Sequence, residues 1–333
     1  MVKDVERLRP HAKTNKMAEV CGMMMDAGIL KFKCATIAEA EMLGMIGAKD
    51  VLLAYQPGGP KIQRLFALMQ KYPATKFSCL IDNISSARNI SGGFSANNSS
   101  IDVYIDVNNG MNRSGIKPAE AFELFGAARV IHGIQIIGLH GYDGHIRDTN
   151  VGERQHRSDD AFQQLKELQQ KIASEYSITL KLVTSGSPTF PTHAQREGIE
   201  CSPGTFVFWD WGYKTAVPDE PFELAALVVT RVISIIDGTT ICTDLGHKSV
   251  AAENPFPRVH FLNAPEATPI GQSEEHLIAK VPDSGKFAIG DVLYGAPIHI
   301  CPTVALYERA LVIENHEAVT EWKVIARDRK ITV

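Results

Sequence analysis

The chain has 333 residues, of which 44% are hydrophobic and 22% are charged, and its formal net charge is −4. These values are ordinary for a globular protein with one large domain or two smaller ones. The basic residues are scattered, so no nucleic-acid-binding surface is indicated. No apolar run reaches the roughly 18 residues of a membrane span, and the charged first residues predict no signal peptide. Six widely spread cysteines predict reduced thiols in a cytoplasmic protein.

After the first residues, short apolar runs alternate with helical stretches. The expected strands are Leu8–Lys13, Lys31–Thr36, Asp50–Tyr55, Phe77–Ile81, Ile101–Val107, Ile134–Tyr142, Leu180–Ser185 and Ile199–Cys201. The helical patterns include Ile37–Ile46, Pro60–Lys71, Pro118–Val130 and Glu153–Glu175. Eight such units in about 200 residues favour an α/β fold of the (β/α)8 TIM-barrel type, with an open doubly wound sheet as the alternative. The Gly/Ser/Asn-rich stretch Ser91–Ser100 is expected to be a loop.

The pattern changes near Trp211. Runs rich in β-branched residues follow, and the expected strands are Leu227–Ile236, Arg258–Leu262, His276–Val281, Val292–Tyr294, Leu311–Glu314 and Trp322–Ile325. No long helical stretch separates these runs, which predicts a mainly antiparallel β domain. We therefore predict a barrel domain over residues 1–215 and a β domain over residues 216–333.

Lys13 ends the first expected strand. Active sites of β/α barrels lie at the C-terminal ends of the strands, where a partly desolvated lysine amine is nucleophilic. Such a lysine can form a Schiff base with an aldehyde. The alternative is an ordinary surface lysine near a chain end.

Two turns of small residues follow the last two expected barrel strands. Ser185, Gly186 and Ser187 in "LVTSGSPTF", and Gly204 and Thr205 in "CSPGTF", offer backbone N–H groups and hydroxyls. Such turns can wrap a phosphate, and this is the usual phosphate position of a β/α barrel. Loops use the same residues without a ligand, so the two turns together are more informative than either alone.

Further candidates follow two middle strands. In "GLHGYDGHIRD", His140 and Tyr142 share one strand face and His145 lies in the next loop, where a histidine can act as a base near neutral pH. Arg113 in "DVNNGMNRSG" can neutralise a phenolate or carboxylate. The alternatives are a packed polar strand end and a surface arginine.

"PIHICPTVAL" contains His299 and Cys301 two positions apart, so a strand would project both side chains to one face. Imidazole and thiolate together suit zinc and suit a hard alkaline-earth ion poorly. Two protein ligands leave coordination positions for water and substrate, as in a catalytic metal site. The alternative is a strand with a buried core cysteine.

In combination, these motifs resemble one family. "RPHAKTNK", "GMNRSG", "GLHGYDGHI", "TSGSPTF", "CSPGTF" and "HICPTVAL" occur in the order typical of D-threonine aldolases, a group that also holds D-serine dehydratase, over essentially the whole chain. The resemblance implies an alanine-racemase-like barrel, a β domain and a homodimer. It also implies that Lys13 binds pyridoxal 5'-phosphate covalently, Tyr142 packs on the cofactor ring, Arg113 lies near its phenolic oxygen and the two turns surround its phosphate.

The resemblance further implies that His299 and Cys301 bind a divalent metal (zinc, manganese or magnesium) that takes the substrate's β-hydroxyl, with His145 as the candidate base. Such an aldolase cleaves D-threonine and related D-3-hydroxy amino acids to glycine and an aldehyde. A D-serine dehydratase activity, giving a 2-oxo acid and ammonia, is the alternative because a His-x-Cys pair is typical of that branch. A non-catalytic pyridoxal-phosphate-binding protein and a racemase are less favoured, because the metal pair and β domain count against them.

The sequence departs from the family pattern in three places. Asn15 stands where a histidine is usual, so this position cannot titrate. Asn108 and Asn109 replace a shorter and more acidic pattern before Arg113. Only 12 residues precede Lys13, where the resembling proteins have a longer segment that includes a strand of the β domain. We therefore expect an exposed apolar edge that favours association.

Overall fold

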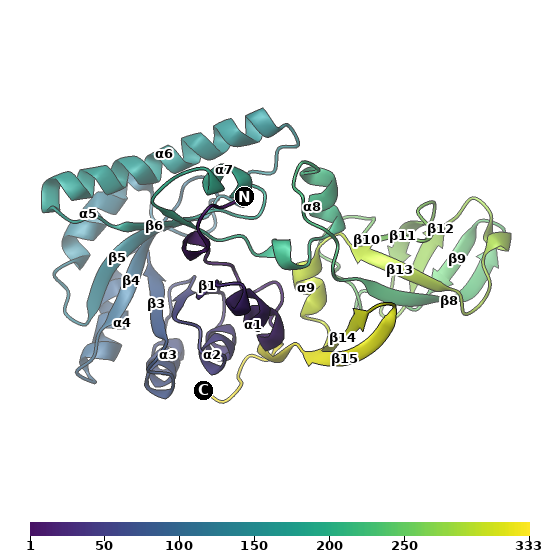
Figure 1. The fold of residues 1–333 in the computed structure, drawn as a ribbon, viewed down its shortest axis with the longest axis horizontal. Helices are drawn as coiled ribbons and strands as arrows, with labels where there is room; N and C mark the ends of the chain where they lie inside the picture. Colours follow the sequence, from purple (N-terminus) through teal and green to yellow (C-terminus); the bar gives the residue numbers. More distant parts are fainter. The chain divides into compact units, whose positions relative to one another are not determined.

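The computed structural model describes all residues from 1 to 333, and the chain forms two compact units (Figure 1). The first unit comprises residues 1–13, 17–204 and 328–333, and the second comprises residues 14–16 and 205–327. The change of unit at Thr205 lies near the predicted boundary after residue 215, whereas the exchange of short segments between the units has no signal in the sequence. None of the helices combines the length and the apolar character that a membrane span requires.

The first unit is built on a curled sheet of seven parallel strands in chain order. The strands are β1 (Lys31–Cys34), β2 (Asp50–Leu53), β3 (Lys76–Ile81), β4 (Ile101–Val107), β5 (Ile134–Gly141), β6 (Lys181–Thr184) and β7 (Ile199–Cys201). The helices are η1 (Val5–Arg7), α1 (Ala18–Asp26), α2 (Ile37–Met45), α3 (Pro60–Lys71), α4 (Ile84–Ser95), α5 (Pro118–Ala128), α6 (Val151–Tyr176) and α7 (Phe190–Ala194). Helices α2 to α6 lie on the outer side of the sheet (Figure 1). The predicted TIM-type architecture is confirmed.

The segment between η1 and Lys13 lies between β7 and β1 and pairs with both strands. Leu8 forms a parallel bridge with Cys201 of β7, and His11 forms one with Lys33 of β1. Pro10 has no N–H group, so the segment pairs through isolated bridges instead of a continuous ladder. The first predicted strand is therefore an irregular segment that still occupies a strand position.

Arg9 anchors this segment from inside the barrel. Its fully buried guanidinium contacts Asp50 of β2 at 2.7 Å and Glu200 of β7 at 2.6 Å. Lys31 of β1 also contacts Glu200, at 2.8 Å. Because both carboxylates are largely buried, loss of Arg9 would leave Asp50 without this counter-charge and Glu200 with Lys31 alone. These ion pairs hold the segment that leads to Lys13.

The loop predicted over Ser91–Ser100 is wrong in its first half, because α4 continues to Ser95. Asn83 caps the helix through its side chain, and Ala87, Ile90 and Phe94 are buried on one helical face. The helical spacing of these apolar residues therefore stabilises the helix more than the glycines destabilise it. Gly93 serves close packing, because a Cβ there would lie 2.4 Å from a side chain of α3.

The second unit contains a six-stranded antiparallel sheet in the order β10-β13-β8-β9-β12-β11, and a separate hairpin of β14 and β15. Its strands are β8 (Val228–Asp237), β9 (Thr240–Thr243), β10 (Val259–Phe261), β11 (Thr268–Gln272), β12 (Leu277–Lys280), β13 (Val292–Pro297), β14 (Arg309–Glu314) and β15 (Glu317–Lys323). The helices are η2 (Thr205–Val207), α8 (Trp211–Ala216), η3 (Ser284–Lys286), α9 (Ile300–Val304) and η4 (Ile325–Arg327).

The predicted antiparallel β domain is confirmed, but the prediction missed β9 and β11. β9 is only four residues long. β11 contains Pro269 and lies at the edge of the sheet, where a missing N–H group is tolerated. Several apolar side chains of β8, including Val229 and Ile236, are exposed, and association through an apolar surface stays a prediction.

Candidate active site

A cavity of about 320 Å³ lies at the C-terminal ends of the first-unit strands. Four side chains selected from the sequence line it, namely Lys13, Arg113, His140 and Tyr142. They come from the segment that precedes β1, from the loop after β4 and from the end of β5. The cavity therefore gathers the candidates from three separate motifs around one space.

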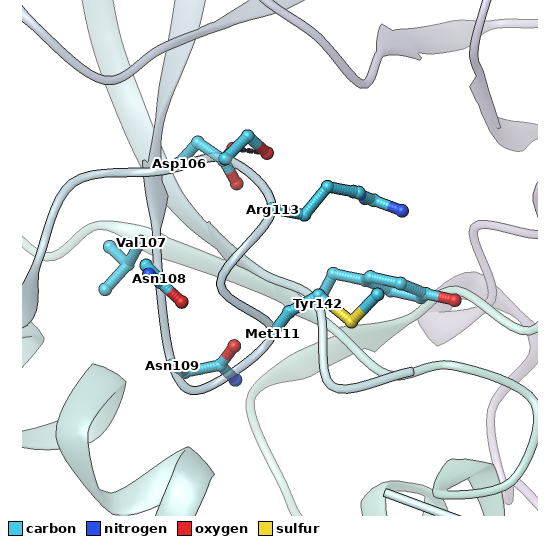
Figure 2. A pocket seen from close by; sticks show the side chains of 8 residues that line it. Asp106, Val107, Asn108, Asn109, Met111, Arg113 and Tyr142 are labelled. Atoms are coloured by element: carbon cyan, nitrogen blue, oxygen red, sulfur yellow. Dashed lines mark hydrogen bonds between the residues drawn. The ribbon is translucent and has the colours of Figure 1, made fainter. Parts of the chain in front are cut away.

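Cationic side chains surround the ring of Tyr142. Nζ of Lys13 lies 5.8 Å from the ring centre and Cζ of Arg113 lies 4.8 Å from it. Figure 2 shows the side chains of Arg113 and Tyr142 extending in the same direction. Gly144 permits this ring position, because a Cβ there would lie 2.0 Å from the Tyr142 hydroxyl. Tyr142 thus presents an aromatic surface bordered by positive charge.

A second lysine, Lys33 of β1, also lines the cavity, and its Nζ lies 5.6 Å from the centre of the Tyr142 ring. It is only 2% exposed. Burial, followed by the positive charge of Lys13, lowers the pKa of Lys33 to about 7. Its Nζ is 3.4 Å from Nε2 of His140.

His140 connects Lys33 to a carboxylate. Nδ1 of His140 lies 2.7 Å from Oδ1 of Asp106, and both side chains are buried. Burial lowers the pKa of His140, with the charge of Lys33 as the next cause, and this outweighs the opposing effect of Asp106. Burial acts to raise the pKa of Asp106, but hydrogen bonds from His140 and Ser114 hold it below its ordinary value. The neutral imidazole therefore donates from Nδ1 to Asp106 and leaves Nε2 as an acceptor facing Lys33.

The two small-residue turns contact each other. The backbone N–H of Gly204 donates to Oγ of Ser187 at 3.2 Å. Ser185 has a φ of 84°, a left-handed conformation that is strained for a residue with a Cβ. The predicted Thr205 begins the longer segment of the second unit.

The turn at Gly186 is held by a buried carboxylate. Oδ1 of Asp143 accepts hydrogen bonds of 2.8 Å from the Gly186 N–H and from the Thr189 hydroxyl. Oδ2 of Asp143 lies 2.7 Å from Nε2 of His193. The Gly186 N–H is thus engaged within the protein, which fixes the backbone of the turn.

Two buried hydroxyls beside these turns have no hydrogen-bond partner. They are Oγ1 of Thr184, at the end of β6, and Oγ of Ser202, just after β7. The backbones of the two residues are joined by a 3.0 Å hydrogen bond. Unsatisfied buried hydroxyls are costly, so this position fits a polar ligand group such as a phosphate.

His145 lies apart from this cavity and is not among the residues that line it. Its Nε2 packs against Gly110, where a Cβ would lie 2.9 Å away. Its Nδ1 is buried without a hydrogen-bond partner, and burial lowers the pKa of its imidazole. Its role as a base stays a prediction.

His299 and Cys301 are not on a strand, so the strand-face interpretation is wrong. β13 ends at Pro297, His299 is the N-cap residue of α9 and Cys301 lies in its first turn. Pro302, also in this turn, suits the start of a helix because the first N–H groups of a helix lack intrahelical partners. The sulfur of Cys301 lies 3.2 Å from the hydroxyl of Thr14.

Glu253, a residue without a predicted role, contacts His299. Its Oε1 lies 2.5 Å from Nδ1 of His299. Burial acts to lower the pKa of His299, but hydrogen bonds with Cys301 and Glu253 and the charge of Asp210 raise it above its ordinary value. A histidine held by a carboxylate, next to a thiol, is a donor set that suits zinc or a similar metal. No group of three or more His, Cys, Asp or Glu side chains is arranged to hold a metal ion.

Two residues of these centres were missed from the sequence. Lys33 belongs to the strand "KFKC", where a lysine at alternate positions reads as the solvent side of a strand. Its side chain instead faces the barrel interior. Glu253 lies in the polar stretch "AAENP", and its contact with His299 joins residues 46 positions apart. Neither contact has a local sequence signal.

Comparison with known proteins supports this organisation. The alanine racemase N-terminal domain matches residues 1–210, and a putative serine dehydratase domain matches residues 225–313. The chain is 26% identical to a D-threonine aldolase of Arthrobacter sp., covering 96% of this chain and 85% of that protein. It is 25% identical to a 3-hydroxy-D-aspartate aldolase of Paracoccus denitrificans (97% and 85%) and 22% identical to a D-threo-3-hydroxyaspartate dehydratase of Delftia sp. (95% and 89%).

Solved structures agree with the fold. The D-threonine aldolase of Filomicrobium marinum superposes with a TM-score of 0.88 at 25% identity, covering 96% of this chain and 87% of that one. A metal-free cysteine-to-alanine variant of D-threo-3-hydroxyaspartate dehydratase gives a TM-score of 0.83 at 20% identity, covering 95% and 89%. A histidine-to-alanine variant of the same dehydratase gives 0.81 at 21% identity, covering 95% and 87%.

The predicted family and enzyme class are confirmed by these matches. The domain match covers more than half of the chain, and the named relatives are aldolases and a dehydratase. The chain therefore belongs to the family of the alanine racemase N-terminal domain, and it is a pyridoxal-phosphate-dependent lyase similar to D-threonine aldolases.

Proposed function

We propose that the protein cleaves D-threonine and related D-3-hydroxy amino acids to glycine and an aldehyde, with pyridoxal 5'-phosphate and a divalent metal as cofactors. The observation that carries this proposal is the cavity in which Lys13, Arg113 and Tyr142 meet. Similarity to a D-threonine aldolase over nearly the whole chain supports the same substrate class.

The residues of the first unit fit pyridoxal phosphate. Lys13 supplies an amine for covalent attachment, and Tyr142 supplies an aromatic surface of the size of the cofactor ring. The strained turn at Ser185 and the unpartnered hydroxyls of Thr184 and Ser202 suit its phosphate. When bound, the cofactor withdraws electrons from the amino acid's Cα and so weakens the bonds to that carbon. Arg113, whose Cζ lies 4.8 Å from the centre of the Tyr142 ring, would add positive charge near the bound cofactor.

We further propose that His299 and Cys301 hold the divalent metal, which acidifies a hydroxyl group of the substrate. Glu253 fixes the His299 ring through Nδ1 and leaves its Nε2 for a metal. The two dehydratase variants replace a histidine and a cysteine that are two positions apart, and the cysteine variant is metal-free. His299 and Cys301 have the same spacing.

This pair also favours a second candidate function. A dehydratase of D-3-hydroxy amino acids would remove the α-proton and the β-hydroxyl, giving a 2-oxo acid and ammonia. The relative from Delftia sp. is a D-threo-3-hydroxyaspartate dehydratase. Aldolase and dehydratase act on the same class of substrate, so their products distinguish them.

Product analysis tests the proposal. The protein is incubated with pyridoxal phosphate, manganese or zinc, and D-threonine or D-threo-3-hydroxyaspartate, with and without a chelator. Glycine and an aldehyde, lost on chelation, are the expected products. A 2-oxo acid with ammonia would establish the dehydratase instead, and no turnover of either substrate by cofactor-loaded protein would contradict both.

A further inference from the structure

Lys33 is a buried amine for which the proposed cofactor attachment has no use. It lies on β1, is 2% exposed and lines the same cavity as Lys13. Burial of a lysine costs free energy, because the charged form loses its hydration. A second lysine at such a position therefore calls for a chemical reason.

A directed chain of hydrogen bonds supports the amine of Lys33. Asp106 accepts from Nδ1 of His140 at 2.7 Å, so Nε2 of the same ring is the acceptor that faces Nζ of Lys33 at 3.4 Å. Asp106 also accepts from Oγ of Ser114 at 3.0 Å and from Nε2 of Gln56 at 3.3 Å. These contacts fix the tautomer of His140 and the direction in which Lys33 donates.

Burial and the charges around Lys33 make both its neutral and its protonated form accessible at neutral pH. Burial and the cations of Lys13 and Arg113 lower its pKa, while the carboxylates of Asp106 and Asp143 oppose them. The net result is a pKa of about 7. Because His140 itself is kept neutral, Lys33 can gain and lose a proton without changing the charge of its hydrogen-bond partner.

Resting on the proposed lyase function, we propose that Lys33 is a catalytic acid–base residue that exchanges protons with the substrate. Its neutral amine takes the proton of the β-hydroxyl as the Cα–Cβ bond breaks, and the hydroxyl oxygen becomes the carbonyl of the departing aldehyde. The electron pair of the broken bond remains at Cα. The ammonium group of Lys33 then returns the proton to Cα, which yields glycine and regenerates the amine without any further reactant.

Hydrogen exchange at Cα of glycine tests this role without any aldehyde. Holoenzyme is incubated with glycine in D2O, and the loss of the α-hydrogen signal is followed by NMR. Lys33→Met should slow this exchange by about 10²- to 10⁴-fold, the usual contribution of general acid–base catalysis. Lys33→Arg should not restore it, because a guanidinium stays protonated. Added methylamine should partly rescue Lys33→Met, which a merely structural role of Lys33 would not allow.

Peptide mapping and an NMR titration test the role of Lys33 without measuring activity. Borohydride reduction followed by peptide mapping should place the cofactor on Lys13 in the wild type and in Lys33→Met. In protein labelled with 13Cε-lysine, the signal absent from Lys33→Met should titrate near neutral pH. A cofactor attached to Lys33, or titration near the ordinary value of about 10.4, would overturn the proposal.

Lys49→Met is the matched control, because Lys49 is exposed and lies directly before β2. It should exchange glycine at the wild-type rate. Unchanged exchange in folded, cofactor-loaded Lys33→Met would also overturn the role of Lys33. If the wild type exchanges glycine in a Lys33-dependent way but cleaves no D-3-hydroxy amino acid, the proposed reaction fails while the acid–base role of Lys33 is supported.

Discussion

The two candidate centres of this chain control protonation in opposite ways. In the barrel unit, burial lowers the pKa values of Lys33 and His140, so that Lys33 exchanges its proton near pH 7 and His140 stays neutral there. In the β unit, His299 is partly exposed, and its anionic neighbours Glu253 and Asp210 contribute to a raised pKa. The first environment suits proton transfer, and the second attracts a positive charge.

This difference indicates a division of labour within one enzyme. A neutral, desolvated amine can accept a proton, whereas a histidine with a carboxylate and a thiol nearby suits a divalent cation. The substitutions below change one environment at a time, so each shows whether the two centres contribute separately.

Lys13→Ala should have the largest effect. Without the amine, the cofactor cannot be attached covalently, so turnover should fall to background and the visible absorbance of the reconstituted protein should disappear. Absorbance spectra of the purified variant check this, with Lys49→Ala as the control that keeps the wild-type spectrum. A chromophore that survives the loss of Lys13 would place the attachment site elsewhere.

His299→Ala should show that the metal and the pyridoxal cofactor bind independently. Bound metal should be lost and turnover should fall by about 10²-fold or more, while the visible absorbance stays, because the residues around Lys13 are unchanged. Metal analysis and steady-state kinetics measure the two effects, and His247→Ala provides an exposed histidine as a control. Full activity after complete chelation would remove the metal from the reaction.

Glu253→Gln should also weaken metal binding, but less than His299→Ala does. The glutamine keeps the shape and can still accept a hydrogen bond, but it removes the negative charge beside His299. Metal affinity should fall by about 10- to 100-fold, the usual effect of losing a carboxylate that orients a histidine ligand. Metal titration of the apoprotein measures this, and Glu274→Gln serves as an exposed control. Equal metal affinity in Glu253→Gln and Glu274→Gln would show that Glu253 has no role in metal binding.

Lys33→Met should stabilise the protein while it impairs the reaction. The pKa of Lys33 is about 7 in the folded chain and about 10.4 in an unfolded one, so the unfolded state binds more protons between these values. Wild-type stability should therefore rise between pH 7 and 10, and the variant should lack this part of the rise. At pH 7 the gain should be roughly a few kcal/mol, which denaturant unfolding at several pH values measures. Parallel curves for both proteins would contradict the lowered pKa.

Much of the fold could be predicted because each strand and helix of the barrel has its own pattern of apolar residues in the sequence. Apolar runs such as Ile101–Val107 and the helices between them carry their own pattern, and every regular barrel strand was located. The irregular segment before Lys13 was expected as a strand because its pattern is apolar, but Pro10 prevents a full ladder. The edge strand β11 was missed because Pro269 obscures the signal for a strand.

The candidate site was predicted less completely, because it depends on contacts between distant residues. Lys13, Arg113 and Tyr142 follow strands, and the barrel topology alone brings strand ends together. Lys33 was missed because alternating lysines suggest a solvent face, whereas in a barrel one face of each strand points into the interior. His299 and Cys301 were selected for their chemistry, but their geometry was wrong, since the chain turns from β13 into α9 between Pro297 and Ile300.

The segment that carries Lys13 is also the seam at which the curled sheet meets itself. Isolated bridges at Leu8 and His11, together with the ion pairs of Arg9, hold this seam where a full ladder is missing. A cofactor attached at Lys13, as proposed above, would add its binding free energy to the closed form. On this proposal, cofactor loading and barrel closure are thermodynamically coupled, and amide hydrogens at the seam should exchange faster in the empty protein than in the loaded one.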